Sequence, residues 1–468
     1  MLLALGPRWN PAVVAMEREV YGDPWVSDFI NSKFVPVWVD ADNRPDISDR
    51  YYLGGWPTTA FLTSDGRVLG GETFATAERL CDLLPRVVDA YSVQRKSIDA
   101  QPTPIETRTN VSLENGLDVE VDAWLANHLL EQFDKDHAGF GAGTKRVHRG
   151  AMEFSALRVR AGDLSFSPIL KRTLRAIALG GLYDDVNGGV FHYCGRRDWT
   201  EPSTEKLLGV NATALSLFLE CTDDVYLERA SDLINYVRNT FVKRIDSHSG
   251  FYSSQQADAF YYQSQAVDYS ESAPPPPVDR TVYSDRTSLM AKAYVRAASV
   301  FGDSSLLEFA VDVIEHVVAN TYERGGGIGH QSDLKSGVRG LLVDQVFTSS
   351  ALLDLYTATD RDVYLDMAQE IMHFSIHKLW DGEGGGGFRD RVPDPDDIGL
   401  LQEPVRPFMA NCEAARVLSR LSHLTAETAF RERALATLAA VGPVARTHGV
   451  DAASYALALG EATNATET

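Results

Sequence analysis

Two short ribbons of the sequence each place a histidine three residues after a pair of glycines, in Gly188-Gly-Val-Phe-His192 and Gly326-Gly-Ile-Gly-His330. Histidine is the side chain that titrates closest to neutral pH. If both ribbons face one cavity, His192 and His330 could remove a proton from a carbon and return it, which is the chemistry of an epimerase. The alternative is that each histidine is a hydrogen-bonded structural residue of its own ribbon.

Carboxylates near the same ribbons offer a rival chemistry. An inverting glycosidase needs one protonated and one ionised carboxyl group, roughly 6.5–9.5 Å apart with a water between them. The acids on candidate loops are Asp184, Asp185, Asp198, Glu205, Asp258 and Asp344. We take Glu205 and Asp258 as the acidic candidates for catalysis beside the two histidines. In a chain with 65 acidic residues, however, some carboxylates lie near loops by chance.

Polar and aromatic side chains around these ribbons are candidates for binding a ligand. Rings there could stack on the faces of a sugar, and polar groups could fix its orientation. The candidates are Tyr183, Asp184, Tyr193, Trp199, Lys206, Asn211 and Asp344. Two alternatives stay open. The aromatic residues could be the core of the ribbons, and Glu205-Lys206 could be the solvated first turn of a helix, where an acid favours the positive end of the dipole.

No motif indicates a cofactor or a metal. The glycine clusters lack the Lys-Ser/Thr of a phosphate loop, and none follows a strand and opens a helix as a dinucleotide site requires. The four cysteines, Cys81, Cys194, Cys221 and Cys412, are scattered without a Cys-x-x-Cys pair or a metal-ligand spacing. This pattern predicts reduced, structural thiols in a cytoplasmic protein.

The net charge of −21 argues against nucleic acids and anionic membranes as partners, because both call for basic patches. Ten lysines accompany thirty-four arginines, which fits either adaptation to high salt or an arginine-rich proteome of high GC content. No apolar run approaches the roughly 18 residues that span a bilayer. The start, MLLALGPRW, predicts no signal peptide. A small carbohydrate is the partner that we expect, and the oligomeric state stays open.

Amphipathic helical stretches dominate from residue 119 onward. We expect helices near 119–133, 167–182, 205–221, 224–243, 285–301, 304–321, 341–358, 362–378, 405–422, 426–441 and 451–460. Glycine marks interrupt them six times, about two helices apart, which predicts an open solenoid or a closed ring of hairpins. In a closed ring the connecting ribbons crowd one mouth of a central cavity, where polar groups far apart in the sequence converge.

Residues 1–91 alternate strands with helices and predict a separate α/β domain. We expect strands at 2–5, 34–39 (buried), 58–62 and 67–69, a helical stretch over 10–30 broken at Pro24, and a closing helix at about 75–91. Residues 92–118 are polar and include Gln101-Pro-Thr-Pro104, which predicts a linker. Residues 119–468 remain for the second domain.

The first domain resembles a thioredoxin fold, because Trp56-Pro57 stands just before a strand. In that fold the proline is cis, which the resemblance implies for Pro57. Met16-Glu-Arg-Glu19, Arg44-Pro-Asp-Ile47 and Gly54-Gly-Trp-Pro57 resemble the DsbH-type thioredoxin-domain family that includes spermatogenesis-associated protein 20.

That family carries a Cys-His-Trp-Cys motif just before its Met-Glu-Arg-Glu, and an ungapped alignment puts Asn10 and Val13 at the two cysteine positions. Thiol–disulfide exchange needs one thiolate to attack and a second thiol to resolve the mixed disulfide. Asparagine and valine can do neither. We therefore predict that the first domain is redox-inactive.

The resemblance continues through the second domain, for example at Gly188-Gly189, Glu205-Lys206 and 250–254. It implies a closed (α/α)6 toroid, the architecture shared with six-hairpin glycosidases and N-acylglucosamine 2-epimerases. The predicted fold class is therefore an α/β thioredoxin-like N-terminal domain followed by an all-α (α/α)6 toroid.

This chain departs from the family at three places in the second domain. Relatives have Pro-His-Phe, Asp-Asn-Ala and Ser-Trp-Asn-Gly where this chain has Pro202-Ser-Thr204, Val210-Asn-Ala212 and Asp285-Arg-Thr-Ser288. Either the substrate changed or catalysis lapsed. Three functions stay open: a carbohydrate-processing or sugar-binding toroid, a non-catalytic interaction or scaffold protein, and a thiol–disulfide oxidoreductase by ancestry only.

Overall fold

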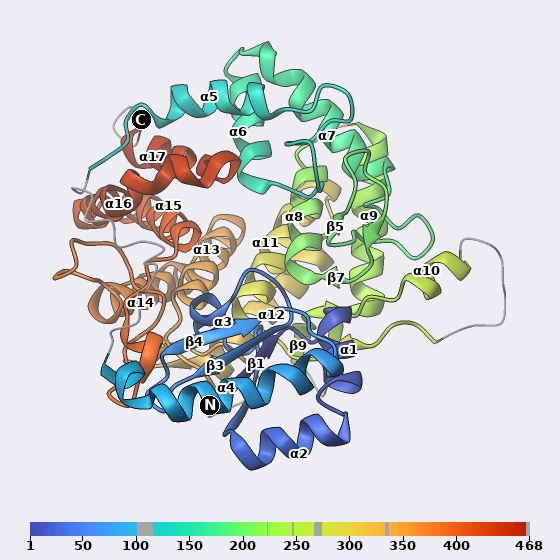
Figure 1. Cartoon of the computed structure of the whole chain (residues 1–468). Helices are drawn as coiled ribbons and strands as arrows, with labels where there is room; N and C mark the ends of the chain where they lie inside the picture. The colour runs from blue at the N-terminus through green and yellow to red at the C-terminus, as the bar shows by residue number, and fades with distance from the viewer. Residues whose placement is uncertain (101–115, 222, 246–247, 266–273, 333–336, 465–468) are drawn as a thin grey trace. The chain divides into compact units, whose positions relative to one another are not determined.

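The computed structural model describes residues 1–100, 116–221, 223–245, 248–265, 274–332 and 337–464 (Figure 1). The chain forms two compact units. The first comprises Met1–Val111 with Pro393–Val405, and the second comprises Ser112–Val392 with Arg406–Thr468. In the part of the chain that is described, no helix combines the length and the apolar character that crossing a bilayer requires.

The expected domain limits need two corrections. Helix α4 (Ala77–Ala100) runs past residue 91 into the expected linker, because residues 91–100 contain neither glycine nor proline to end it. Most of the remaining linker, 101–115, lies outside the described residues. The second correction is that residues 393–405, expected in the toroid, belong to the first unit.

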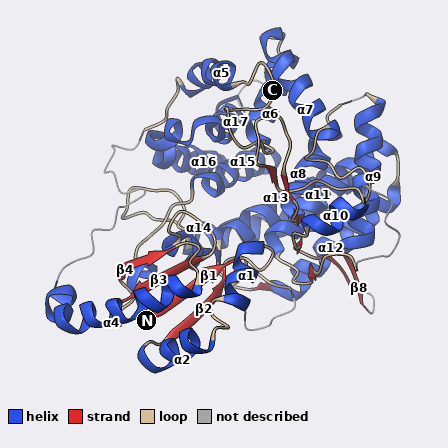
Figure 2. Ribbon diagram, turned by 45° about the vertical axis from the view of Figure 1, so that its right-hand side comes forward, coloured by secondary structure: helices blue, strands red, loops and turns tan. Residues whose placement is uncertain are grey.

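A four-stranded sheet in the order β2-β1-β3-β4 forms the centre of the first unit (Figure 2). β1 (Leu2–Gly6) is parallel to β2 (Pro36–Asp40) and antiparallel to β3 (Thr58–Leu62), and β3 is antiparallel to β4 (Val68–Glu72). Every residue of β1 and β3 is buried. The expectation of a buried strand at 34–39 is wrong: Val37 and Trp38 are 37% and 38% exposed, because β2 lies at the edge of the sheet.

Helices cover both faces of this sheet. They are α1 (Pro11–Glu19), α2 (Pro24–Lys33), α3 (Pro45–Tyr51) and α4. Leu2 and Phe61 pack with Met16, Ile30 and Leu84 from α1, α2 and α4. The neighbouring residues of the same strands point the other way, as the pleat requires, and pack with Tyr51 of α3.

The segment 393–405 contributes a 3-10 turn, η2 (Gly399–Gln402), beside α3. The backbone N–H of Leu400 donates to the Tyr51 hydroxyl at 3.2 Å, and Arg50 Nε donates to the Leu400 carbonyl at 2.8 Å. Leu400 also packs against the hydrophobic cluster on that face of the sheet. A segment that is distant in sequence thus packs against the core of the first unit.

Positions 10 and 13 of the first unit serve folding. The Asn10 side chain caps α1 by accepting hydrogen bonds from the backbone N–H groups of Ala12 (2.9 Å) and Val13 (3.2 Å), and Val13 is buried. Cys81 on α4 is the one cysteine within this unit's sequence. The Trp56–Pro57 peptide bond is cis, as the resemblance implied.

We expect Asn10→Ala to lower the free energy of unfolding by about 1 kcal/mol, because two N–H groups of the first helical turn lose their acceptor. Urea titration monitored by tryptophan fluorescence measures this loss. Asn10→Asp keeps an acceptor oxygen and is the matched control. An equal loss in both variants would contradict the capping role.

Six helix pairs build the second unit. They are α5 (Val121–Gln132) with α6 (Arg149–Arg160), α7 (Ser167–Leu179) with α8 (Leu208–Phe218), α9 (Asp224–Thr240) with α11 (Ser284–Phe301), α12 (Ser304–Thr321) with α13 (Leu342–Thr359), α14 (Asp362–Lys378) with α15 (Phe408–Thr425), and α16 (Thr428–Val441) with α17 (Ala453–Asn464). Shorter pieces are η1 (Leu164–Phe166), α10 (Ala259–Gln265) and η3 (Gly442–Ala452).

The second helix of each pair forms a closed inner ring. Around it, α6 contacts α8, α8 contacts α11, α11 contacts α13, α13 contacts α15, α15 contacts α17, and α17 returns to α6. Among the described residues, the first helices of the pairs pack outside this ring, as α9, α14 and α16 do in Figure 1. The predicted (α/α)6 toroid is therefore confirmed, and the open solenoid is wrong.

Glycine ribbons connect an outer helix to the next inner helix. Paired strands form two of them, β8 (Val242–Ile245) with β9 (His248–Phe251) and β12 (Tyr322–Glu323) with β13 (Gly327–Ile328). Single bridges close three others at Phe133–Phe140, Tyr183–Val190 and Trp380–Phe388. Further short strands near the ribbons are β5 (Tyr193–Cys194), β6 (Pro202–Ser203), β7 (Lys206–Leu207), β10 (Ser254–Gln255) and β11 (Val278–Asp279).

Candidate functional site

Backbone pairing joins successive ribbons beside the N-terminal ends of the inner helices. Lys145 pairs with Cys194, and β7, just before α8, pairs with β10 and through it with β11. Tyr283, the N-cap of α11, pairs with Gln331. Leu341, the N-cap of α13, pairs with Arg391. The ribbons therefore gather at one end of the ring, as expected for a closed toroid, and we call this the ribbon end.

His192 and Glu205 form a hydrogen-bonded pair at the ribbon end. His192 Nδ1 lies 2.8 Å from Glu205 Oε1. The Ser203 hydroxyl reaches both carboxylate oxygens of Glu205, at 2.9 and 2.7 Å. The Glu205 side chain is 1% exposed, whereas the His192 side chain is 32% exposed. A buried, anchored carboxylate thus orients an imidazole that solvent reaches.

His330 is placed differently from His192. Its Nδ1 lies 3.0 and 3.1 Å from the two carboxylate oxygens of Asp344, and both side chains are almost fully buried. Burial raises the pKa of Asp344, against the opposing effect of His330. The expectation that both histidines face a cavity is therefore wrong for His330, whose ring packs beside Tyr283 instead.

Asp285 lies close to this buried pair. Ligand-type atoms of Asp285, His330 and Asp344 all lie within 4.8 Å of one another. One Asp285 oxygen, Oδ1, is buried without a hydrogen-bond partner. These three groups are the donors available to a cation at the ribbon end among the described residues, a combination that the sequence spacing did not indicate.

Asp184 and Lys206, predicted to bind a ligand, instead hold a ribbon in shape. Asp184 Oδ1 accepts from the N–H groups of Val186 and Asn187 at 3.0 and 3.1 Å. Lys206 Nζ donates to Asp184 Oδ2 at 2.6 Å and to the Gly188 carbonyl at 2.7 Å. Both side chains are buried, with exposures of 0% for Lys206 and 5% for Asp184. We call this arrangement the cation staple.

The cation staple recurs in two other ribbons. Lys145 Nζ donates to Asp134 Oδ2 at 2.8 Å and to the Gly141 carbonyl at 2.7 Å. Arg406 Nε donates to Asp381 Oδ2 at 3.1 Å, and its NH2 donates to the Gly384 carbonyl. Recurrence at three equivalent places marks the staple as part of the repeating architecture rather than of one binding site.

Asn211, another predicted binding residue, belongs to a second recurring element that we call the amide staple. Its Oδ1 accepts from the Val190 N–H at 2.8 Å, and its Nδ2 donates to the Val190 carbonyl at 3.0 Å. Gln345 makes the same two bonds to Ile328, and Asn411 makes them to Phe388. All three amides are fully buried, so each fixes a ribbon onto an inner helix.

The other predicted residues have separate places. Trp199 is buried and donates from Nε1 to the His137 carbonyl at 2.8 Å. Tyr183 is buried beneath Arg229, whose guanidinium lies 4.1 Å from the ring centre. Asp258 caps α10 by accepting from the Tyr261 N–H at 2.9 Å. Tyr193 is half-buried and lies edge-on to His192, at 5.1 Å between ring centres. Of these four, Tyr193 accompanies the His192–Glu205 pair.

A pocket that sequence reasoning missed opens between the inner helices. Its volume is about 440 Å³, and its wall comes mainly from α15, with further residues from α6, α11, α13 and α17. The lining residues are Arg149, Lys292, Ser350, Thr357, Glu413, Arg416, Val417, Ser419, Arg420, His423, Leu424 and Glu461. We call it the lumen pocket.

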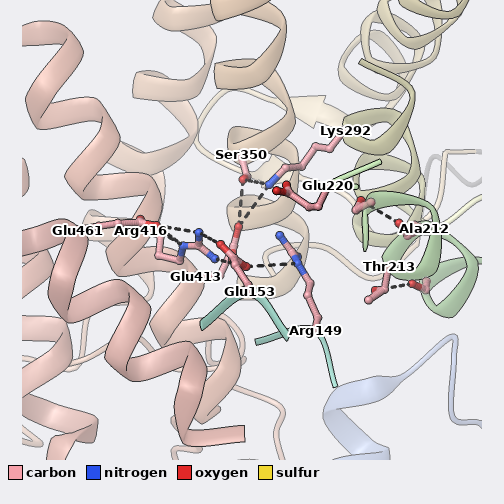
Figure 3. A network of polar contacts seen from close by, with 12 residues as sticks. Arg149, Glu153, Ala212, Thr213, Glu220, Lys292, Ser350, Glu413, Arg416 and Glu461 are labelled. Atoms are coloured by element: carbon pink, nitrogen blue, oxygen red, sulfur yellow. Dashed lines mark hydrogen bonds and ion pairs between the residues drawn. The ribbon is translucent and has the colours of Figure 1, made fainter. Parts of the chain in front are cut away.

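Charged side chains form a network along the wall of the lumen pocket (Figure 3). Arg416 binds Glu153 of α6 at 2.5 Å and Glu461 of α17 at 2.7 Å. Glu413 accepts from the Ser350 hydroxyl at 3.0 Å and lies 3.6 Å from Lys292 Nζ. Burial alone would raise the pKa of Glu413, but the charges of Lys292, Arg149 and Arg416 outweigh it and lower the pKa to about 2.

A sequence signal for the lumen pocket exists in hindsight. Glu413, Arg416 and Arg420 fall at helical spacing within α15, a helix whose other positions are mostly apolar and buried. Charges that recur on one face of an otherwise buried helix indicate a polar surface inside the fold.

Comparison with known proteins supports both units. Residues 1–109 match the family model of the thioredoxin-like DsbH domain, described as a "protein of unknown function, DUF255". Spermatogenesis-associated protein 20 of Mus musculus is 25% identical over 277 residues, covering 52% of this chain and 34% of that protein. The chain thus spans about a third of this relative's length. The Homo sapiens protein of the same name is 21% identical, covering 91% of this chain and 71% of its own.

Solved structures share the toroid. A sugar epimerase from a ruminal bacterium has a TM-score of 0.54 at 14% identity, covering 68% of this chain and 86% of its own. Cellobiose 2-epimerase from Spirochaeta thermophila has a TM-score of 0.53 at 18% identity, covering 68% and 83%. At these identities the likeness establishes the fold alone. The family match over residues 1–109 and the similarity to proteins named spermatogenesis-associated protein 20 support the resemblance of this chain to the DsbH-type thioredoxin-domain family.

Proposed function

We propose that the toroid processes a small carbohydrate at its ribbon end, with His192 as the acid–base group and Glu205 as its positioning partner. The observation that carries the proposal is the pairing of a solvent-accessible imidazole with a buried, doubly anchored carboxylate. Because an ionised carboxylate only accepts hydrogen bonds, Nδ1 donates to Glu205, and Nε2 is then the basic nitrogen of the neutral ring. That arrangement suits removal of a proton next to a sugar carbonyl and its return.

The fold is shared with a sugar epimerase and a cellobiose 2-epimerase, and also with family 76 glycoside hydrolases, so it supports carbohydrate chemistry without separating the two reactions. The two expected carboxylates favour proton transfer by His192 over hydrolysis, because Asp258 is engaged as a helix cap and Glu205 is held by Ser203 and His192. The first unit, which lacks cysteines at positions 10 and 13, is proposed to take no part in thiol exchange.

Proton exchange in D2O tests the proposal. The full chain is incubated with glucose, mannose, N-acetylglucosamine and cellobiose, and the C2 proton of each sugar is followed by NMR. We expect exchange with at least one sugar, and a loss of roughly a hundredfold or more in His192→Asn. His148→Asn is the matched control, because His148 also pairs with a carboxylate, Asp451 at 3.1 Å. Absence of exchange with every sugar, or full exchange in His192→Asn, contradicts the proposal and favours a scaffold function.

A further inference from the structure

The lumen pocket carries an excess of positive side chains on its wall. Four lining residues are cations, Arg149, Lys292, Arg416 and Arg420, and two are carboxylates, Glu413 and Glu461. This bias occurs in a chain whose net charge is −21. Two further carboxylates that pair with these cations, Glu153 and Asp354, are not among the lining residues, so the cations face the space. Such a surface attracts small anions, because the walls of a cleft concentrate the field of its charges.

The pairing of these cations is uneven. Arg416 is fully engaged, because Glu153 and Glu461 both bind its guanidinium. Arg420 and Lys292 share one carboxylate, Asp354, at 2.7 and 4.0 Å. Among the described residues, Arg149 makes one ion pair, a contact of 4.0 Å between its Nε and Glu153 Oε2. Arg149 therefore retains most of its capacity to bind an anion.

Three of the cations face the same space. Figure 3 shows the guanidinium of Arg149 pointing toward Glu413 and Lys292. Burial lowers the pKa of Lys292, and the charges of Arg149 and Arg420 lower it further, against Asp354 and Glu413. An anion placed among these three groups would relieve their repulsion. The hydroxyl groups of Ser350, Thr357 and Ser419 also line the wall, and because each donates within the protein, each offers an acceptor to a ligand hydroxyl.

We propose that the lumen pocket binds a small, sugar-sized ligand through a phosphate or carboxylate group held by Arg149, Lys292 and Arg420. Its volume of about 440 Å³ lies within the usual range of about 300–1,000 Å³ for small-molecule pockets. The guanidinium of Arg149 suits a bidentate contact to such a group, and Lys292 adds a point charge. Neither His192 nor Glu205 lines this pocket, and the proposal does not rest on the function proposed for that pair.

Isothermal titration calorimetry on the full chain tests this proposal. The probes are glucose 6-phosphate, glucuronate, inorganic phosphate and uncharged glucose, at constant ionic strength. We expect saturable binding of glucose 6-phosphate or glucuronate and none of glucose. Arg149→Gln and Lys292→Gln should each weaken binding roughly tenfold or more, because each removes one charge-assisted contact. Arg158→Gln, on the same helix but bonded to Asp122 on α5, should bind as the wild type does.

A charge change of the opposite sign separates an anion site from a structural network. Glu413→Gln removes a negative charge from the wall and should tighten binding of the anionic probe several-fold. If that variant does not fold, Glu461→Gln replaces it with the same expected direction. The proposal is overturned if no anionic probe binds saturably, if glucose binds as tightly as the anions, or if Arg149→Gln and Lys292→Gln both bind like the wild type.

Discussion

We expect Lys206→Met to lower the free energy of unfolding by about 3–5 kcal/mol, because it leaves the buried carboxylate of Asp184 without its counter-ion. Burial lowers the pKa of Lys206 to about 8, although Asp184 opposes the shift. The pair as a whole therefore contributes little net stability, and the double variant Lys206→Met/Asp184→Asn should recover most of the loss. Urea unfolding followed by far-UV circular dichroism measures both values.

The pH dependence of this loss has a defined sign. Between about pH 8 and the ordinary lysine pKa of about 10.4, the unfolded chain binds one proton more at this position than the folded chain does. The wild type should therefore gain stability relative to Lys206→Met as pH rises through that window. A difference that is constant from pH 7.5 to 10 would argue that Lys206 does not titrate as its burial implies.

Lys145→Met is the matched control within the same recurring element. Lys145 and Asp134 are as deeply buried as Lys206 and Asp184. Asp134, however, keeps a second cation, because Arg197 donates to its two oxygens at 2.7 and 2.8 Å. We therefore expect a smaller loss, of about 1.5–3 kcal/mol, the scale of one charged hydrogen bond. Equal losses of unfolding free energy in Lys206→Met and Lys145→Met would contradict the explanation that the unpaired carboxylate of Asp184 causes the larger loss.

Asn411→Leu should lower the free energy of unfolding by about 3 kcal/mol, because it leaves the N–H and the carbonyl of Phe388 without partners inside the fold. The same urea experiment measures this loss. Gln345→Leu, in the equivalent amide staple, should show a loss of the same size. Asn320→Leu, an exposed position on α12, is the control and should stay within about 0.5 kcal/mol of the wild type.

The helices that bury an apolar stripe were predictable from the sequence, and one of the inner helices was not. Apolar periodicity located α12 to within a residue at each end. It missed α6 (Arg149–Arg160), which closes the ring between α17 and α8. Arg149 and Glu153 of this helix lie in the lumen network, so charges occupy positions where a buried helix normally shows apolar residues. The charged residues of α6 that belong to the lumen network are thus the reason why apolar periodicity did not predict this helix.

The ribbon-end residues were located correctly as a group, but sequence could not assign their roles. A polar residue beside a glycine turn can bind a ligand or stabilise the turn itself, and a single sequence does not distinguish these two roles. Asn211, Lys206 and Asp184 proved to be staples because each has an equivalent in other ribbons at altered spacing, as Asn411 and Gln345 show. Only three-dimensional superposition of the repeats reveals that equivalence.

The turn that Leu400 and its neighbours add beside Tyr51 makes the N-terminal unit discontinuous along the chain. Expression of the first 111 residues alone would omit this turn and would leave the Tyr51 hydroxyl with its bond to the Gly66 carbonyl but without the N–H of Leu400. The second unit, produced from residue 112 onward, would still contain residues 393–405, and Leu400 would lack the hydrophobic cluster against which it packs. To produce the two units separately, residues 393–405 must therefore be removed from the second unit and joined to residues 1–111.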